Sequence, residues 1–233
     1  MSRIQAIARL LEDSTAGGAR RLAQVFEDFV ELAAITLRNA VDHADQAAWQ
    51  AREARFAEVA ARYTADERTR FAEALALVTI ELHRAPGDVL GSLYMSLDLG
   101  NERLGQFFTP YSVAQVMASL AAPSLVQQIR ETGHATLYEP ACGAGAFIIA
   151  VAEQLRAVGL EPQRTLRVSM EDVYAQAMHM SYIHLSLLHV PAAVHHRDTL
   201  TGESFSSWPT FAFLVQQHQR KPQLDSLVQG EPR

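Results

Sequence analysis

The stretch EPACGAGAF, residues 139–147, decides the fold of this 233-residue chain. It lies between a short apolar run typical of a strand, residues 135–138, and the helical run FIIAVAEQLRAVG, residues 147–159. A turn from strand to helix needs glycine where the backbone takes positive φ or where a ligand comes too close for a Cβ. The free amides at the helix start suit a carboxylate or a phosphate. Gly-x-Gly alone is equally typical of any tight turn, so its neighbours must decide the function.

The residues that follow repeat the alternation of strand and helix. Residues 166–170 read as a second strand that ends in Glu171-Asp172, residues 175–190 as a helix, and residues 193–196 as a third strand before Asp198. This order predicts an α/β fold with a parallel, doubly wound sheet. A carboxylate after the second strand accepts from ribose hydroxyls in nucleoside-binding folds, or is a solvated strand end. Asp198 would accept from an adenine amino group, or is a turn or cap aspartate.

The first 100 residues have a different character, with many alanines and apolar residues at helical spacing. Thr64 and Glu67 have the spacing of a capping box, Pro86-Gly87 ends that helix, and Asp88 caps a further short one. We therefore expect an all-helical subdomain over residues 1–100 and an α/β domain over residues 101–215. Residues 216–233 are expected to form a polar, loosely ordered tail.

Composition and charge narrow the class of protein. The net charge of −6 argues against a broadly basic protein that coats nucleic acid, although a local patch remains compatible with DNA binding. Such a patch would use Arg20, Arg21, Arg52 and Arg55, whose helical spacing is equally typical of a solvated face. The single cysteine rules out an intramolecular disulfide, and we recognise neither a signal peptide nor a membrane span. A cytoplasmic protein is expected.

Other chemistry finds little support in the sequence. His184, His189, His195 and His196 do not have the spacing of a common zinc site, so no metal is expected. Cys142 lacks a positioned base that would make it a nucleophile. No serine-centred triad motif is present.

Several motifs together resemble one known family. Gln106-Phe107-Phe108-Thr109-Pro110 resembles the motif that precedes the cofactor domain in the modification subunits of type I restriction systems and related N6-adenine DNA methylases. The stretch 139–147 resembles the family's Asp-Pro-Ala-Cys-Gly-Ser-Gly-x-Phe loop, with Glu for Asp and Ala for Ser. Residues 180–185, the turn 198–200 and the segment 88–94 also fit the family's order. The resemblance covers about residues 88–202.

The resemblance implies a truncated Rossmann-like methyltransferase domain that binds S-adenosylmethionine (SAM), with DNA as a partner. Phe108 and Thr109 would line the methionine end, and Asp172, preferred over Glu171 for its spacing to the next helix, would take the ribose hydroxyls. Asp198 would contact the adenine. The complete implied site consists of Phe108, Thr109, Glu139, Pro140, Ala141, Gly143, Gly145, Asp172 and Asp198.

One element of the family pattern is missing. These enzymes use an Asn/Asp-Pro-Pro-aromatic tetrapeptide, which binds and stacks the flipped adenine. The nearest segment here is Trp208-Pro209-Thr210-Phe211, and Trp cannot accept a hydrogen bond. We expect no strand between Asp198 and this segment, and the catalytic residues stay unknown. Two function classes remain open: a DNA adenine-N6 methyltransferase completed by another subunit, or a non-catalytic SAM-binding or regulatory module. The helical region is the expected contact for a protein partner or a second copy.

Overall fold

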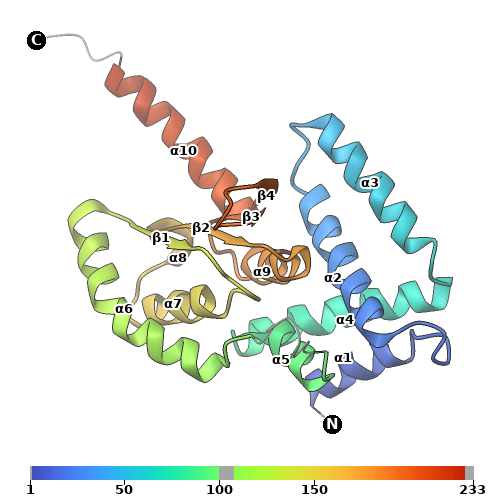
Figure 1. The fold of residues 1–233 in the computed structure, drawn as a ribbon. Helices are drawn as coiled ribbons and strands as arrows, with labels where there is room; N and C mark the ends of the chain where they lie inside the picture. Colours follow the sequence, from blue (N-terminus) through green and yellow to red (C-terminus); the bar gives the residue numbers. More distant parts are fainter. Residues whose placement is uncertain (1, 100–107, 229–233) are drawn as a thin grey trace, which may run out of the picture.

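The computed structural model describes residues 2–99 and 108–228, with side chains described up to residue 219. The N-terminal region is helical, as the sequence predicts (Figure 1). Its elements are α1 (Arg3–Glu12), α2 (Leu22–Asn39), α3 (Gln46–Ala60), α4 (Ala65–Arg84) and α5 (Val89–Ser96).

The predicted start signals of two helices are confirmed. The hydroxyl of Thr64 accepts from the Glu67 amide at 3.2 Å, and the Glu67 carboxylate accepts from the Thr64 amide at 2.8 Å, which completes a capping box at α4. The carboxylate of Asp88 accepts from the Gly91 amide at 2.7 Å and caps α5.

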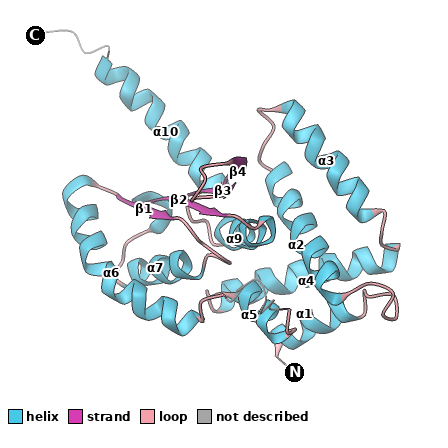
Figure 2. Ribbon diagram, viewed as in Figure 1, coloured by secondary structure: helices cyan, strands magenta, loops and turns pink. Residues whose placement is uncertain are grey.

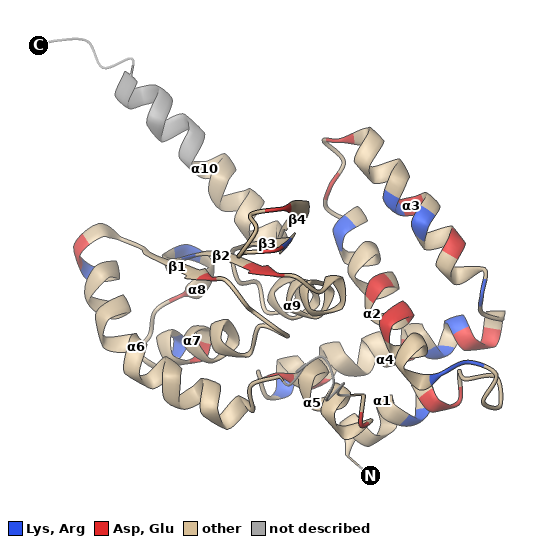
Figure 3. Cartoon of the chain, viewed as in Figure 1, with Lys and Arg blue, Asp and Glu red and all other residues tan. Residues whose placement is uncertain are grey.

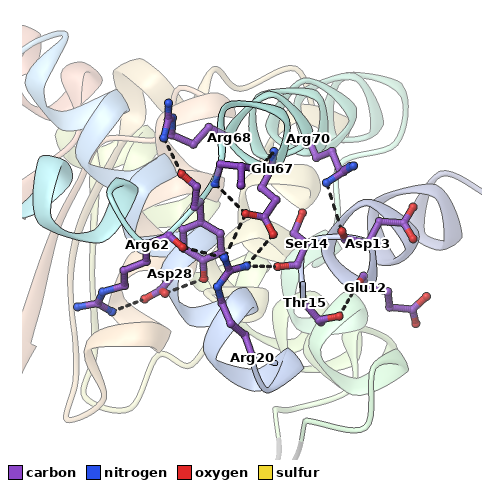
Figure 4. Close-up of polar contacts among 12 residues, drawn as sticks. Glu12, Asp13, Ser14, Thr15, Arg20, Asp28, Arg62, Glu67, Arg68 and Arg70 are labelled. Carbon is purple, nitrogen blue, oxygen red and sulfur yellow. Dashed lines mark hydrogen bonds and ion pairs between the residues drawn. The ribbon is translucent and has the colours of Figure 1, made fainter. Parts of the chain in front are cut away.

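A half-buried arginine, Arg20, joins the helices of this region (Figure 4). The guanidinium of Arg20 donates to both carboxylate oxygens of Glu67, at 2.7 and 3.1 Å, and to the carbonyls of Ser14 and Arg62. The same guanidinium lies 4.4 Å from the ring centroid of Tyr63. One side chain therefore connects α4 with the two loops that follow α1 and α3.

The arginines considered as a DNA-binding patch are largely engaged with acids. Arg20 pairs with Glu67, Arg52 with Asp42 and Arg55 with Glu31, each at 2.7–2.8 Å. Figure 3 shows positive and negative residues interleaved along α3, which lies beside the negative residues of α2. These contacts favour the solvated and structural use of the arginines, because their charge is already offset by neighbouring carboxylates.

The α/β region follows (Figure 2). Its helices are α6 (Tyr111–Thr132), α7 (Ala146–Ala157), α8 (Pro162–Thr165), α9 (Ala175–Leu187) and α10 (Phe211–Val228). Its strands are β1 (Ala135–Glu139), β2 (Leu166–Asp172), β3 (Ala192–Arg197) and β4 (Ser204–Pro209).

The sheet has the order β1-β2-β3-β4. The first three strands are parallel and joined through α7 and α9, which lie together on one face of the sheet in Figure 1. The predicted βαβ order and its Rossmann-like class are confirmed, in a form shortened to three parallel strands. The carboxyl ends of β1 and β2 meet at one edge, where ligands of such sheets bind.

Two expectations for the C-terminal part are wrong. A fourth strand, β4, lies between Asp198 and Phe211 and pairs antiparallel with β3. Its residues SFSSWP lack clear alternation, and pairing with β3 supplies the order that their own pattern does not. The backbone of residues 216–228 is also not a loose tail, because α10 runs from Phe211 to Val228.

The two regions share one continuous apolar core. Helix α2 packs against α9, and the Arg38 guanidinium on α2 donates to the Pro209 carbonyl at 3.0 Å. Within the described residues, we find no helix with the length and hydropathy needed to cross a membrane.

Candidate functional site

A cavity of about 270 Å³ lies at the carboxyl ends of β1 and β2. Its size is close to the lower end of small-molecule sites, at about 300 Å³. The turn after β1, the start of α9 and the residue that caps α5 all contribute to its wall. The lining residues are Asp88, Phe108, Thr109, Met117, Glu139, Ala141, Cys142, Gly143, Ala144, Ala146, Phe147, Asp172, Val173, Tyr174 and Ala177.

The glycine turn has the geometry that the sequence predicts. Gly143 and Gly145 take φ values of +55° and +84°, a region that disfavours side chains. A Cβ at Gly143 would lie 3.0 Å from Cδ1 of Phe108. The ring of Phe108 is in turn held edge-on against Tyr94 of α5, with 5.0 Å between centroids. The turn is therefore shaped by close contact with a segment outside the sheet.

Glu139 is the most unusual group in the cavity wall. Its Oε2 atom is buried and has no hydrogen-bond partner among the described residues. Burial, with a further contribution from the nearby charge of Asp172, raises the pKa of Glu139 to about 8. A buried carboxylate without a partner is costly, and a cation that entered the cavity would remove this cost.

Asp172 and Glu171 are neighbours in sequence, but their side chains contact different groups. Asp172 lines the cavity and accepts from the amides of Gly143 and Tyr174, each at 2.9 Å. Burial raises its pKa, and these two hydrogen bonds partly oppose that shift. Glu171 is absent from the cavity lining and binds the hydroxyls of Tyr138 and Thr199 instead. The structure thus brings to the cavity the carboxylate that the spacing argument prefers.

The remaining predicted residues divide into two groups. Phe108, Thr109 and Ala141 line the cavity, whereas Pro140, Gly145 and Asp198 do not. The Oδ1 atom of Asp198 accepts from the amides of Leu200 and Thr201, which is the turn role considered as its alternative. Residues 106 and 107 of the predicted motif lie outside the described residues.

Asp88 is the main cavity residue that the sequence analysis assigned only to a helix cap. It is 6% exposed, and it caps α5 while also lining the cavity. Helix capping is a sufficient reason for an aspartate at position 88, so the residue type and its spacing to α5 did not predict a second role in the cavity. Tyr174 and Phe147 were also missed, because their contribution depends on how α7 and α9 are placed.

The segment 208–211 is built into the fold away from the cavity. Trp208 packs against the rings of His179 and Tyr182, and the Thr210 hydroxyl donates to the Val190 carbonyl. Pro209 pairs with Ala193 at the amino end of β3, whereas the cavity lies at the carboxyl end of the neighbouring strand. This segment therefore does not stand in for the missing catalytic tetrapeptide.

The lone cysteine and the histidines add no separate chemistry at the cavity. Burial raises the pKa of the Cys142 thiol, which keeps it protonated and a poor nucleophile. In the part of the chain that the structure describes, no group of three metal-ligating side chains comes together.

The donor set fits a cationic nucleoside such as SAM. SAM carries an ammonium and a sulfonium, and three carboxylates, those of Asp88, Glu139 and Asp172, line one cavity. The unpartnered Oε2 of Glu139 would accept from a cationic group, and the side-chain-free turn at Gly143 allows close approach of a ligand. When bound, this cofactor supplies an activated methyl group.

Two solved structures are similar to this chain. The chain resembles a solved protein from Listeria monocytogenes that is assigned as a class I S-adenosylmethionine-dependent methyltransferase, with 13% identity and a TM-score of 0.49 over 93% of this chain and 69% of that one. It also resembles the type I restriction-modification methyltransferase subunit of Streptococcus thermophilus, with 21% identity and a TM-score of 0.36 over 58% of this chain and 29% of that one. A comparison with the curated proteins finds no match.

A family model also matches this chain, and this match establishes the family. The model of the N-6 DNA methylase family covers residues 88–221, more than half of the chain, and begins at the cavity residue Asp88. The protein belongs to the N-6 DNA methylase family, whose cofactor is S-adenosylmethionine.

Proposed function

We propose that this chain is the cofactor-binding part of a DNA adenine-N6 methyltransferase and that it binds SAM in the cavity between β1 and β2. The observation that carries the proposal is the buried, unpartnered Oε2 of Glu139 beside a turn with two glycines at positive φ. A cationic ligand satisfies this carboxylate, and a SAM-dependent family supplies one.

The residues of the cavity take distinct parts in this proposal. Glu139 binds the cationic methionine end, and Asp172 accepts from the ribose hydroxyls while its amide contacts hold the turn at Gly143. Thr109 lies at the methionine carboxylate, and Phe108 walls the cavity. Asp198 remains our proposal for the adenine end, although its Oδ1 already holds a turn.

Calorimetric titration of the purified chain with SAM tests the binding. We expect saturable binding that Gly143→Val abolishes, since a branched side chain at this position would collide with Phe108 and fill the approach to the turn. Asp172→Ala should weaken SAM binding at least tenfold, because a charge-assisted hydrogen bond contributes about 1.5–3 kcal/mol.

Glu171→Ala is the matched control for this titration. Glu171 lies next to Asp172 but faces Tyr138 and Thr199, so we expect it to lower thermal stability more than affinity. An equal or larger loss of affinity from Glu171→Ala would overturn the assignment of the ribose carboxylate. Absence of saturable binding at millimolar SAM would overturn the proposed site.

The proposal also includes the reaction itself, the transfer of a methyl group to adenine. It requires an acceptor beside the adenine amino group and a platform for the flipped base. The sequence has no Asn/Asp-Pro-Pro-aromatic tetrapeptide, and the segment 208–211 lies away from the cavity. We therefore propose that a partner subunit supplies these groups and that the chain alone is a poor methyltransferase. Transfer of labelled methyl to unmethylated DNA at low salt tests this, and robust activity of the chain alone would contradict it.

A second function, a non-catalytic SAM-binding or regulatory module, is favoured by the same missing tetrapeptide. One measurement distinguishes these two functions. A restriction-modification partner that restores adenine methylation would support the first function, whereas SAM-dependent binding of such a partner without any methyl transfer would support the second.

A further inference from the structure

Asp88 is an acidic group of the cavity that comes from outside the sheet. It caps α5 of the helical region, is 6% exposed, and lines the same cavity as Glu139 and Asp172. A surface cap would need no such burial. The contacts that hold Asp88 beside the cavity, and the groups that it faces there, therefore bear on its role.

Gly91 makes room for the Asp88 carboxylate. The Gly91 amide donates to Asp88 Oδ1 at 2.7 Å, and a Cβ built on Gly91 would lie 2.1 Å from Asp88 Oδ2. Because no real Cβ contact is this short, a larger residue at position 91 would displace the carboxylate. The local sequence Asp88-x-x-Gly91 thus fixes the carboxylate over the first turn of α5.

His184 of α9 ties this cap to the cofactor turn. Its Nδ1 lies 2.8 Å from the Ala144 carbonyl, which can only accept, so Nδ1 carries the proton. Its Nε2 lies 3.1 Å from the Leu90 amide, which can only donate, so Nε2 is unprotonated. The two contacts together require the neutral Nδ1–H form, and the ring is fully buried. His184 joins α5 and the glycine turn through one side chain.

The neutral form of His184 leaves the charge of Asp88 without compensation from the ring. The two side chains approach to 4.0 Å, between Nδ1 and Oδ1, but a neutral imidazole supplies no opposite charge. In its ionised form Asp88 therefore adds negative potential to the cavity that Glu139 and Asp172 also line. Burial raises the pKa of Asp88, so a bound cation would also favour this ionised form. A ligand with more positive charge gains more from this potential.

We infer that Asp88 is a specificity-determining residue that favours the positively charged SAM over its demethylated product, S-adenosylhomocysteine, and that His184 is its positioning residue. This inference rests on the proposed SAM site. The two molecules differ at the sulfur, which is a cationic sulfonium in SAM and a neutral thioether in the product. A carboxylate in the cavity wall distinguishes them by charge, and would favour release of the product.

Asp88→Asn tests the charge with little change in shape. Asparagine caps helices as well as aspartate, so α5 keeps its cap. We expect affinity for SAM to fall on the order of tenfold and affinity for S-adenosylhomocysteine by less than about threefold. The ratio of the two affinities, measured by calorimetry on the full chain, should therefore fall.

Asp45→Asn is the matched control. Asp45 also caps a helix of the same region, accepting from the Ala48 amide at 3.0 Å, but it does not line the cavity. This variant should leave both affinities unchanged. Thermal unfolding of both variants reports whether either cap change disturbs the fold.

Two substitutions separate the contacts of His184. His184→Gln places an acceptor near the Nε2 position and can keep the Leu90 contact, whereas His184→Asn places a donor near Nδ1 and can keep the Ala144 contact. If His184 positions the Asp88 cap, His184→Asn should lower the SAM preference more than His184→Gln does. A purely structural role would lower stability in both variants and leave the ratio of affinities unchanged.

The outcomes distinguish this inference from the proposed function. Failure of the native chain to bind either molecule would overturn the proposed site. Binding of SAM by the native chain, with an unchanged ratio in Asp88→Asn, would overturn only the role of Asp88. A lowered ratio in Asp88→Asn with an unchanged ratio in both His184 variants would retain Asp88 and overturn the role of His184.

Discussion

Glu67 in the helical region is buried, and Glu139 in the α/β region has one carboxylate oxygen, Oε2, buried, but the partners of the two groups differ. The hydrogen bonds from Arg20 lower the pKa of Glu67 to about 2, while burial and the charge of Asp172 raise the pKa of Glu139 to about 8. Glu67 is satisfied within the fold, whereas Oε2 of Glu139 has no hydrogen-bond partner in the part of the chain that the structure describes. The difference separates a carboxylate that holds the structure together from one that, in our proposal, a cationic ligand completes.

The contrast extends beyond this pair. In the helical region, Asp42 and Glu31 also have arginine partners. At the cavity, Asp172 accepts from the neutral amides of Gly143 and Tyr174, and burial raises the pKa of both Asp172 and Asp88. The acids with arginine partners therefore stabilise the fold, whereas burial raises the pKa of the three cavity acids, Asp88, Glu139 and Asp172, and a bound cation would favour their ionised forms.

The largest expected effect comes from removing the partner of Glu67. Arg20→Ala leaves a buried carboxylate without its ion pair and removes contacts to two loops, so the free energy of unfolding should fall by about 3 kcal/mol. Urea denaturation at pH 7 measures this. SAM affinity below the unfolding transition should not change, and a loss of affinity without a loss of stability would break the division between the regions.

The pH dependence of stability should differ between the two glutamates. The pKa of Glu139 is raised from 4.5 to about 8, so the folded state binds more protons than the unfolded state, and stability falls as pH rises from about 4.5 to 8. Glu67 has a lowered pKa, so its contribution is present above 4.5 and is lost as pH falls toward 2.

Glu139→Gln tests the predicted fall in stability between pH 4.5 and 8. This variant should flatten the fall in stability between pH 5 and 8 and raise the free energy of unfolding at pH 8 by about 1–2 kcal/mol, while SAM affinity falls. Glu67→Gln is the opposite control, because it should destabilise the protein at neutral pH. Destabilisation of similar size by both variants at pH 8 would contradict the comparison.

Binding of SAM should itself depend on pH. A cation favours the ionised form of Glu139, so affinity should rise by roughly twentyfold between pH 6.5 and 8.5, as the carboxyl group loses its proton through a pKa of about 8. Calorimetry in two buffers of different ionisation enthalpy would also detect proton release at pH 7. A pH-independent affinity that persists in Glu139→Gln would show that Glu139 does not face the cation.

The smallest effect is expected at an exposed ion pair. Arg55 binds Glu31 at 2.7 Å, but its side chain is 42% exposed, so Arg55→Ala should lower the free energy of unfolding by less than about 1 kcal/mol. Added salt should reduce even this difference. An effect as large as that of Arg20→Ala would mean that burial does not set the strength of the arginine contacts.

Local signals in the sequence predicted much of the fold. The capping residues Thr64 and Asp88 act within one helical turn, and the glycines at 143 and 145 meet a backbone requirement of their own turn. The alternation of strands and helices over residues 135–197 then required only the usual handedness of parallel connections. Such features depend on neighbours a few residues away, which is why the sequence predicts them.

The tertiary structure alone decided where the side chains meet. His184 binds the Leu90 amide across 94 residues, and Arg20 binds Glu67 across 47, so neither contact follows from spacing. β4 forms because β3 offers it a partner, and its own residues show little pattern. The sequence by itself determined a glycine turn, an acidic strand end and a family. Packing determined that Asp88 joins Glu139 and Asp172 at one cavity, because burial and charge depend on distances in space.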